Sequence, residues 1–384
     1  MLTAIAVLSL VIWIMLLVAR GGFWQAHERD DHDPLGTGAP DAWPAVVAVI
    51  PARNEAASIA QTVSSLLRQD YPGSVRVVVV DDHSEDGTAA LACDAARAMG
   101  AAGRLTVLRG EPLPVGWTGK LWAVRQGIDA AHATDPPPAW LLLTDADIEH
   151  APDNLRQLVT RAILDRRVMV SLMAKLRCDA WFERALIPAF VLFFQMLYPF
   201  SWVNRRDHPM AAAAGGCMLV QVEALRAAGG IEAIRDEIID DCALGARMKT
   251  QGAIWLGLTN RVRSVRPYDS LGEIHRMVAR TAYAQLHYSP WLLCGTIVSL
   301  LVTFVAPPLV VLFGSGLARV AGALAWAAMT FAYLPMLRFY GLSRGWGPCL
   351  PVVAVLYTAF TLDSALQHWR GRGGMWKGRA QARR

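Results

Sequence analysis

The sequence predicts an α/β fold in which helices flank a mainly parallel sheet, with transmembrane helices at both ends of the chain. Runs rich in Val, Ile and Leu alternate with helix-like segments between residues 45 and 145. These runs are almost continuously apolar, as strands buried on both faces of a parallel sheet must be. The longest apolar segments instead lie near the two ends, and their lengths suit a membrane span.

The central elements follow one another as repeating strand and helix units. We expect strands at 46–50, 75–80, 105–108 and 141–144, and helices at 58–69, 88–99 and 121–131. Parallel strands end at one edge of a sheet, and open α/β sheets bind their ligands there. We therefore expect residues 45–290 to form one domain with its site at that edge.

Composition indicates a membrane protein. The 384 residues are 54% hydrophobic and 18% charged, and the mean hydropathy is +0.30. Residues 2–19 are apolar and end at Arg20. No charged side chain precedes them and no small-x-small cleavage site follows, so residues 1–20 are predicted to be an uncleaved anchor. Residues 21–44 would then be a linker.

The second apolar region covers residues 291–369. It divides into segments 291–313, 317–337 and 348–369, each long enough to span, and Pro307-Pro308 is expected to kink the first. Basic flanks favour the cytoplasm for the segment after Arg20 and for the tail, residues 370–384. A cytoplasmic domain followed by three full spans would put the tail outside. One of the three segments is therefore expected to be re-entrant or interfacial. Our candidate is 348–369.

One further apolar segment, residues 186–203, lies inside the expected α/β domain. A full span there would split the domain, so an interfacial helix and a buried core helix are the two possibilities. An interfacial helix would seat this domain on the bilayer and let a lipid enter it from the side.

Cysteine and charge exclude several function classes. The six cysteines are scattered without paired spacing, which argues against a zinc site or a disulfide framework. The net charge of +5 comes largely from the tail and is typical of attraction to anionic lipid. No basic and aromatic patch suggests a nucleic-acid partner.

Asp145 and Asp147 follow the strand expected at 141–144. Alternation places both carboxylates on one face. Two hard oxygen ligands cannot hold a divalent cation alone, but they suit Mg²⁺ or Mn²⁺ shared with a diphosphate. The alternative is that both residues only cap the next helix.

Polar residues also follow the first two strands. Arg53 and Glu55 would face the ligand crevice, where Arg53 can meet a phosphate and Glu55 can accept hydrogen bonds from a ribose or base. The alternative is a capped loop. The second strand ends at Asp81-Asp82, carboxylates that can accept from a base imide or a ribose hydroxyl. Residues 86–88 are typical of a turn and helix cap only.

These pieces, in this order, resemble glycosyltransferase family 2, whose members have the GT-A fold. The family pattern runs P-x-x-N-E, D-D-x-S-x-D-G-T, G-K-x-x-A, D-x-D and E-D. It is matched in order by Pro51/Asn54/Glu55, residues 81–88, residues 119–123, Asp145/Asp147 and Asp240-Asp241. The resemblance covers about residues 45–290. With the anchor, the C-terminal membrane block and residues 116–120, the chain is most similar to the hopanoid-associated glycosyltransferases of bacteria.

The resemblance implies a site and its cofactor. It implies a nucleotide-sugar donor, expected to be a UDP-sugar, held by Pro51, Arg53, Glu55, Asp82, Lys120 and Asp145. It implies Mg²⁺ or Mn²⁺ on Asp145 and Asp147, and Asp241 as the base of an inverting transfer.

Three further residues are candidates for phosphate or acceptor contacts, namely Asp240, Arg280 and Gly216. Asp240-Asp241 could also be an acidic helix start, and Gly215-Gly216 a tight strand turn. Processive members of the family carry Q-x-x-R-W, of which residues 277–281 keep only Arg280, so a single transfer is expected.

The sequence thus predicts a multi-pass protein of the bacterial inner membrane with a cytoplasmic catalytic domain. It would move one sugar from a nucleotide donor to a lipid acceptor, with a hopanoid as the candidate. One alternative is a sugar transferase acting on polyprenyl phosphate, an acceptor that is already ionised and needs no base. The other is a catalytically silent membrane protein that binds nucleotide sugars.

Overall fold

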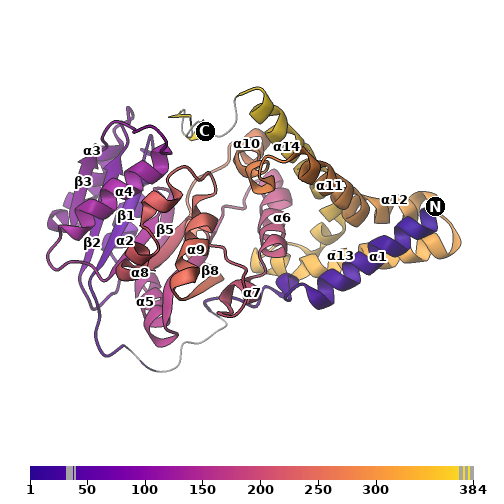
Figure 1. Cartoon of the computed structure of the whole chain (residues 1–384), viewed down its shortest axis with the longest axis horizontal. Coiled ribbons are helices and arrows are strands. Elements are labelled where there is room, and N and C mark those ends of the chain that lie inside the picture. The colour runs from indigo at the N-terminus through magenta and orange to yellow at the C-terminus, as the bar shows by residue number, and fades with distance from the viewer. Residues whose placement is uncertain (32–37, 39, 372–374, 377–378, 381–384) are drawn as a thin grey trace. The chain divides into compact units, whose positions relative to one another are not determined.

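The computed structural model describes residues 1–31, 38, 40–371, 375–376 and 379–380, and these residues form two compact units (Figure 1). The sheet unit comprises the described residues of Glu28–Arg177, Trp202–Pro267 and Met375–Arg384. The helical unit comprises Met1–His27, Cys178–Ser201 and the stretch from Tyr268 to Gly371. Most of the predicted basic tail lies outside the described residues, so its role stays a prediction.

The sheet of the sheet unit has the strand order β3-β2-β1-β4-β7-β6-β8-β5. Its strands are β1 (Val46–Ala52), β2 (Val75–Asp81), β3 (Leu105–Arg109), β4 (Trp140–Thr144), β5 (Ile148–His150), β6 (Arg167–Lys175), β7 (Cys217–Gln221) and β8 (Ala253–Ser264). β1 pairs in parallel with β2 and β4, and β6 with β8, whereas β7 runs antiparallel to β4 and β6. A pair of two-residue strands, β9 (Met375–Trp376) and β10 (Arg379–Ala380), stands apart from this sheet.

The helices of this unit alternate with its strands. They are α2 (Ile59–Leu67), α3 (Thr88–Ala98), α4 (Gly119–His132), α5 (Asn154–Leu164), α8 (Val222–Ala227) and α9 (Asp240–Gln251). Each predicted strand and helix of the first half is present, with its ends shifted by at most two residues. Every residue of β1 and β4 is buried, which explains why these strands are apolar apart from Thr144.

Close packing of α4 positions the start of that helix. A Cβ added at Gly127 would lie 2.4 Å from Val49 Cγ1, so only glycine lets α4 approach β1 so closely. A helix that follows a parallel strand starts at the strand's carboxyl end. The first turn of α4, with Lys120, therefore lies at the edge of the sheet where β1 and β4 end.

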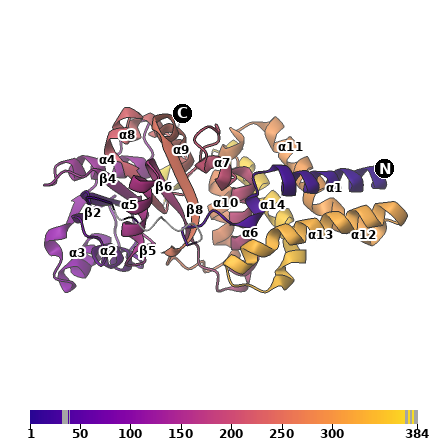
Figure 2. The same cartoon turned by 90° about the horizontal axis from the view of Figure 1, so that it is seen from below.

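The helical unit contains the apolar ends of the chain. Its helices are α1 (Leu2–Ala19), α6 (Trp181–Leu197), α10 (Leu271–Thr281), α11 (Pro290–Leu300), α12 (Ala306–Phe313), α13 (Gly316–Phe339) and α14 (Leu350–Trp369). α1, α12 and α13 lie side by side (Figures 1 and 2). Four stretches are long and apolar enough to cross a membrane: 2–19, 290–313, 316–339 and 344–369. Their orientation, and the re-entrant role expected for one of them, stay predictions.

A π-helical turn, Leu301–Val305, interrupts the second of these stretches just before Pro307-Pro308. The carbonyl of Thr303 would accept from residue 307 in an α-helix and from residue 308 in a π-helix, but proline has no N–H. Trp13 Nε1 of α1 donates to this carbonyl at 2.8 Å. The indole thus replaces a backbone donor that the two prolines remove.

Replacing Trp13 by Phe should lower the free energy of unfolding by about 1–3 kcal/mol, because the buried Thr303 carbonyl would lose its donor. The measurement is thermal unfolding of the full chain in detergent. Trp291→Phe is the matched control, since Trp291 is 85% exposed. Equal stability of the two variants would show that the hydrogen bond is dispensable.

α6 belongs to the helical unit, although the chain enters it from the sheet unit and returns there. The Phe193 ring packs edge-on against Phe304 and Tyr357. The Arg20 guanidinium donates to the carbonyls of Met196 and Leu197, both at 3.0 Å, and so caps the C-terminal end of α6. The short helix α7 (Phe200–Asn204) follows. The interfacial placement of residues 186–203 stays a prediction.

Part of the predicted linker is paired with the sheet. The Leu258 N–H donates to the Glu28 carbonyl (2.8 Å) and the Asp30 N–H donates to the Leu258 carbonyl (3.1 Å). Thr259 Oγ1 donates to Asp30 Oδ2 at 2.6 Å. Residues 28–30 therefore extend the sheet beside β8.

Candidate active site

The loops that follow β1 and β2 are joined by hydrogen bonds. The N–H of Asn54 donates to Ser84 Oγ and the N–H of Glu55 donates to Thr88 Oγ1, both at 2.9 Å. Asp86 accepts a further N–H from the first loop at 3.0 Å. The interpretation of residues 86–88 as turn and cap residues alone was therefore too narrow, because they also hold the first loop.

Asp82, Arg53 and Pro51 lie at these adjoining strand ends. Asp82 is only 3% exposed, and its Oδ2 lies 3.7 Å from Arg53 Nη1. The same guanidinium nitrogen donates to the Asp82 carbonyl. Pro51, on β1, lines the cleft described below. The structure thus brings the three predicted nucleoside contacts together, and their roles stay predictions.

Glu55 and Asp147 are joined by Arg266, a residue that follows β8. Arg266 Nη2 lies 2.7 and 2.9 Å from the two Glu55 oxygens, and Arg266 Nε lies 3.5 Å from Asp147 Oδ2. Ser264 Oγ donates to the same Asp147 oxygen at 3.1 Å. Burial raises the pKa of Asp147 and the Asp145 charge raises it further, while Arg266 lowers it.

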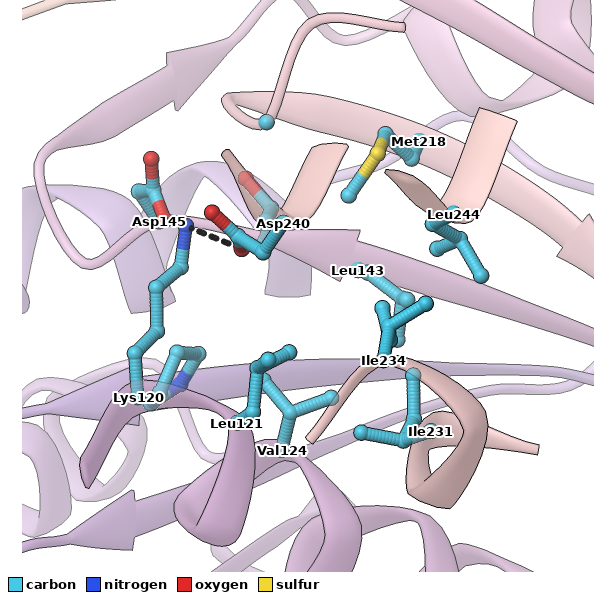
Figure 3. A pocket seen from close by; sticks show the side chains of 13 residues that line it. Lys120, Leu121, Val124, Leu143, Asp145, Met218, Ile231, Ile234, Asp240 and Leu244 are labelled. Atoms are coloured by element: carbon cyan, nitrogen blue, oxygen red, sulfur yellow. Dashed lines mark ion pairs between the residues drawn. The ribbon is translucent and has the colours of Figure 1, made fainter. Parts of the chain in front are cut away.

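Lys120 joins the two acidic motifs. Its Nζ lies 3.1 Å from Asp145 Oδ1 and 3.0 Å from Asp240 Oδ2, as Figure 3 shows for the second pair. Burial lowers the pKa of Lys120, but the charges of Asp145, Asp240 and Asp241 more than offset this, so its pKa is raised. Lys120 is therefore a permanent cation at this point of the site.

Asp241 is held by two backbone donors at the start of α9. Gly215 N–H donates to its Oδ2 at 3.0 Å and Cys242 N–H to its Oδ1 at 2.8 Å. Burial, with the charge of Asp240, raises the pKa of Asp241 to about 6, against the opposing effects of Lys120 and the two N–H groups. A carboxylate of this kind is ionised at neutral pH yet basic enough to accept a proton.

A buried polar network supports the loop that holds Asp241. Thr144 Oγ1 donates to the Gly216 carbonyl (2.7 Å) and lies 3.0 Å from His150 Nε2. His150 Nδ1 lies 3.0 Å from Asn154 Nδ2. Burial lowers the pKa of His150 to about 3, so the ring is neutral. Gly216 thus acts in the structure through its backbone carbonyl.

A narrow cleft opens beside Lys120 and Asp240 (Figure 3). Most of its wall is apolar and comes from α4, β4, β7, α9 and the 3₁₀ turn Ile231–Ile234. Its lining residues are Pro51, Lys120, Leu121, Val124, Leu143, Thr144, Asp145, Gly215, Met218, Ile231, Ile234, Asp240 and Leu244.

The carboxylates of the site outnumber its cations, which is relevant to the predicted metal ion. Contacts and charge interactions connect five carboxylates with two cations, Lys120 and Arg266; the carboxylates are Glu55, Asp145, Asp147, Asp240 and Asp241. An anionic diphosphate would be repelled by such an excess of negative charge. Within the described part of the chain, no three His, Cys, Asp or Glu side chains are grouped to hold a metal alone. Asp145 and Asp147 therefore fit a divalent cation that takes its other ligands from a diphosphate.

Arg280 is the one predicted site residue on the helical unit. It lies on α10 with an exposed side chain, and no described contact joins it to the residues above. Arg266, Thr144, His150 and Asn154 were not predicted. The order of β8 and β7 in the sheet, which the sequence does not show, brings them to the site.

The comparisons with known proteins agree with this architecture. Residues 47–229 match the model of the family described as Glycosyl transferase family 2. The mannosyltransferase PcManGT from Pyrobaculum calidifontis, solved with GDP-Man and Mn²⁺, aligns with a TM-score of 0.62 and 19% identity over 97% of this chain and 100% of that chain. The predicted α/β fold is therefore confirmed.

Weaker structural similarities extend to two other proteins. S. aureus TarS has a TM-score of 0.41 and 15% identity over 62% of this chain and 39% of that chain. Mannosyl-3-phosphoglycerate synthase from Rubrobacter xylanophilus has a TM-score of 0.36 and 18% identity over 68% of this chain and 75% of that chain. No curated protein sequence matches this chain.

Proposed function

We propose that this chain is a glycosyltransferase that moves one sugar, with inversion, from a nucleotide-sugar donor to the hydroxyl of a membrane lipid, and the match of residues 47–229 to the Glycosyl transferase family 2 model supports this proposal. One observation carries the proposal. Asp241 is a partly buried carboxylate with a pKa raised to about 6, in the same cluster of charges as Lys120 and Asp145. An inverting transfer needs such a base next to a cation that balances the negative charge of the leaving diphosphate.

The transfer follows from this arrangement. The Asp241 carboxylate accepts the proton of the acceptor hydroxyl as the oxygen bonds to the anomeric carbon of the sugar. The bond between that carbon and the diphosphate breaks on the opposite face, and the nucleoside diphosphate leaves with the electron pair. Lys120 lies where it can offset part of the leaving group's charge. The proton then passes from Asp241 to solvent.

Asp145 and Asp147 would hold the divalent cation. When bound, Mg²⁺ or Mn²⁺ neutralises charge on the diphosphate. The mannosyltransferase neighbour was solved with Mn²⁺, which supports this choice of cofactor.

Pro51, Arg53, Glu55 and Asp82 would receive the nucleoside. Their place at the ends of β1 and β2 is where open α/β sheets bind nucleotides. A UDP-sugar is the expected donor, and the GDP-Man of the mannosyltransferase neighbour makes a GDP-sugar the alternative to test.

The acceptor is assigned from the apolar helices. Four stretches of the chain are apolar enough to cross a membrane, so a lipid is the acceptor within reach of a membrane-anchored site. We propose a hopanoid in the bacterial inner membrane, with the sheet unit on the cytoplasmic side. A neutral hydroxyl needs a base to remove its proton, whereas a polyprenyl phosphate does not. The presence of Asp241 therefore favours a hydroxyl acceptor.

The test is transfer of labelled sugar by the purified full chain in lipid nanodiscs with Mn²⁺. UDP- and GDP-sugars are supplied with either a hopanoid extract or polyprenyl phosphate, and the lipid product is identified by mass. A glycosylated hopanoid that requires Asp241 is the expected result. A product formed only on polyprenyl phosphate would contradict the acceptor assignment. Nucleotide binding without any turnover would identify the silent alternative.

A further inference from the structure

Arg266 lies between two carboxylates that come from different parts of the sheet unit. Its Nη2 contacts both oxygens of Glu55, at 2.7 and 2.9 Å, and its Nε lies 3.5 Å from Asp147. The side chains of Glu55 and Asp147 are 13% and 17% exposed, and that of Arg266 is 40% exposed. A single guanidinium thus pairs with one acid after β1 and with one acid after β4.

The sheet register delivers Arg266 to this position. β5 pairs antiparallel with β8, so that Ile148 faces Ser264. The Val265 N–H then donates to the Asp147 carbonyl at 2.9 Å. Arg266 follows directly and is held beside Asp147 by this backbone contact as well as by charge.

The position of Arg266 conflicts with that of a divalent cation. The outer oxygen of Asp147, Oδ1, accepts no hydrogen bond within the described residues, so a cation shared with Asp145 would bind there. That cation and the guanidinium carry charge of the same sign on the same carboxylate. Their repulsion must weaken metal binding for as long as no anion lies between them.

We propose that Arg266 is a positioning residue that serves as the counter-cation of Glu55 and Asp147 in the donor-free site, and that it makes tight metal binding depend on the donor. The inference rests on the proposed function. A donor diphosphate attracts both the metal and Arg266, so its arrival removes the conflict. Linkage then requires that the nucleotide and the metal each strengthen the binding of the other.

The test compares the full chain with its Arg266→Gln variant in detergent, without any sugar transfer. Mn²⁺ binding is followed by the electron paramagnetic resonance signal of free Mn²⁺, and UDP and GDP binding by calorimetry. Removal of the charge should strengthen the binding of Mn²⁺ alone by about threefold to tenfold. The same variant should bind nucleotide more weakly, because Glu55 loses the group that orients it.

Two further variants serve as controls for the removal of the Arg266 charge. Arg263→Gln removes an exposed arginine from β8, three residues before Arg266, and should change neither affinity. Arg266→Lys keeps the charge and should bind Mn²⁺ nearly as weakly as the wild type. Loss of Mn²⁺ affinity in Arg266→Gln, or no change in it, would overturn the inference while leaving the proposed function intact. A wild-type chain that binds neither Mn²⁺ nor nucleotide would overturn the proposed function itself.

Discussion

Replacement of Asp241 by Asn should lower kcat by roughly two or more orders of magnitude while the affinity for the donor nucleotide stays nearly unchanged. The amide is close in shape to the carboxylate and can still accept the Gly215 N–H, so the start of α9 should be preserved. It cannot accept the acceptor's proton. The measurements are steady-state kcat and nucleotide affinity by calorimetry.

The pH dependence of wild-type activity is a second test of the role of Asp241. Burial raises the pKa of Asp241 to about 6, and only the ionised form can act as a base. Activity should therefore be constant above that pH and fall about tenfold per pH unit below it. The Asn variant should lose this acidic limb.

The exposed Asp236, in the loop before α9, supplies the control. Asp236→Asn should leave kcat and the pH profile as they are. If Asp241→Asn instead destroys nucleotide affinity, Asp241 is a structural residue and the base lies elsewhere.

Replacement of Asp147 by Ala should abolish transfer and remove the metal dependence of donor binding. A hard cation would lose one of its two protein carboxylates, and Arg266 would be left to Glu55 alone. Nucleotide affinity measured with and without Mn²⁺ should differ in the wild type and coincide in the variant.

Asp94→Ala, on the exposed face of α3, is the matched control and should behave as the wild type does. Full transfer by Asp147→Ala, or by the wild type in the presence of a chelator, would rule out a metal on Asp145 and Asp147.

The strands and helices of the first half could be predicted because each is determined by its own residues. The run 140–143 is apolar throughout since both faces of β4 are buried, and the acids that follow this strand emerge at the ligand edge. The helix expected at 121–131 begins two residues earlier, so Lys120 lies in its first turn, and the acidic helix start considered for Asp240-Asp241 is present.

The contacts that hold these site residues in place could not be predicted, because they depend on how distant segments of the chain pair. Arg266 meets Glu55 and Asp147 only through the pairing of β5 with β8, which are more than one hundred residues apart. The Thr144 and His150 network likewise depends on β7 lying antiparallel to β4. No local pattern distinguishes these residues from ordinary polar positions.

The hydrogen bond from Trp13 to Thr303 has a consequence for protein engineering. An N-terminal hydrophobic helix is often treated as a membrane-targeting signal that can be exchanged for any other such signal. Here a generic poly-leucine segment in its place would leave the Thr303 carbonyl without a donor in an apolar surrounding. Engineered versions of the protein should therefore keep residues 2–19 and carry fusion partners elsewhere.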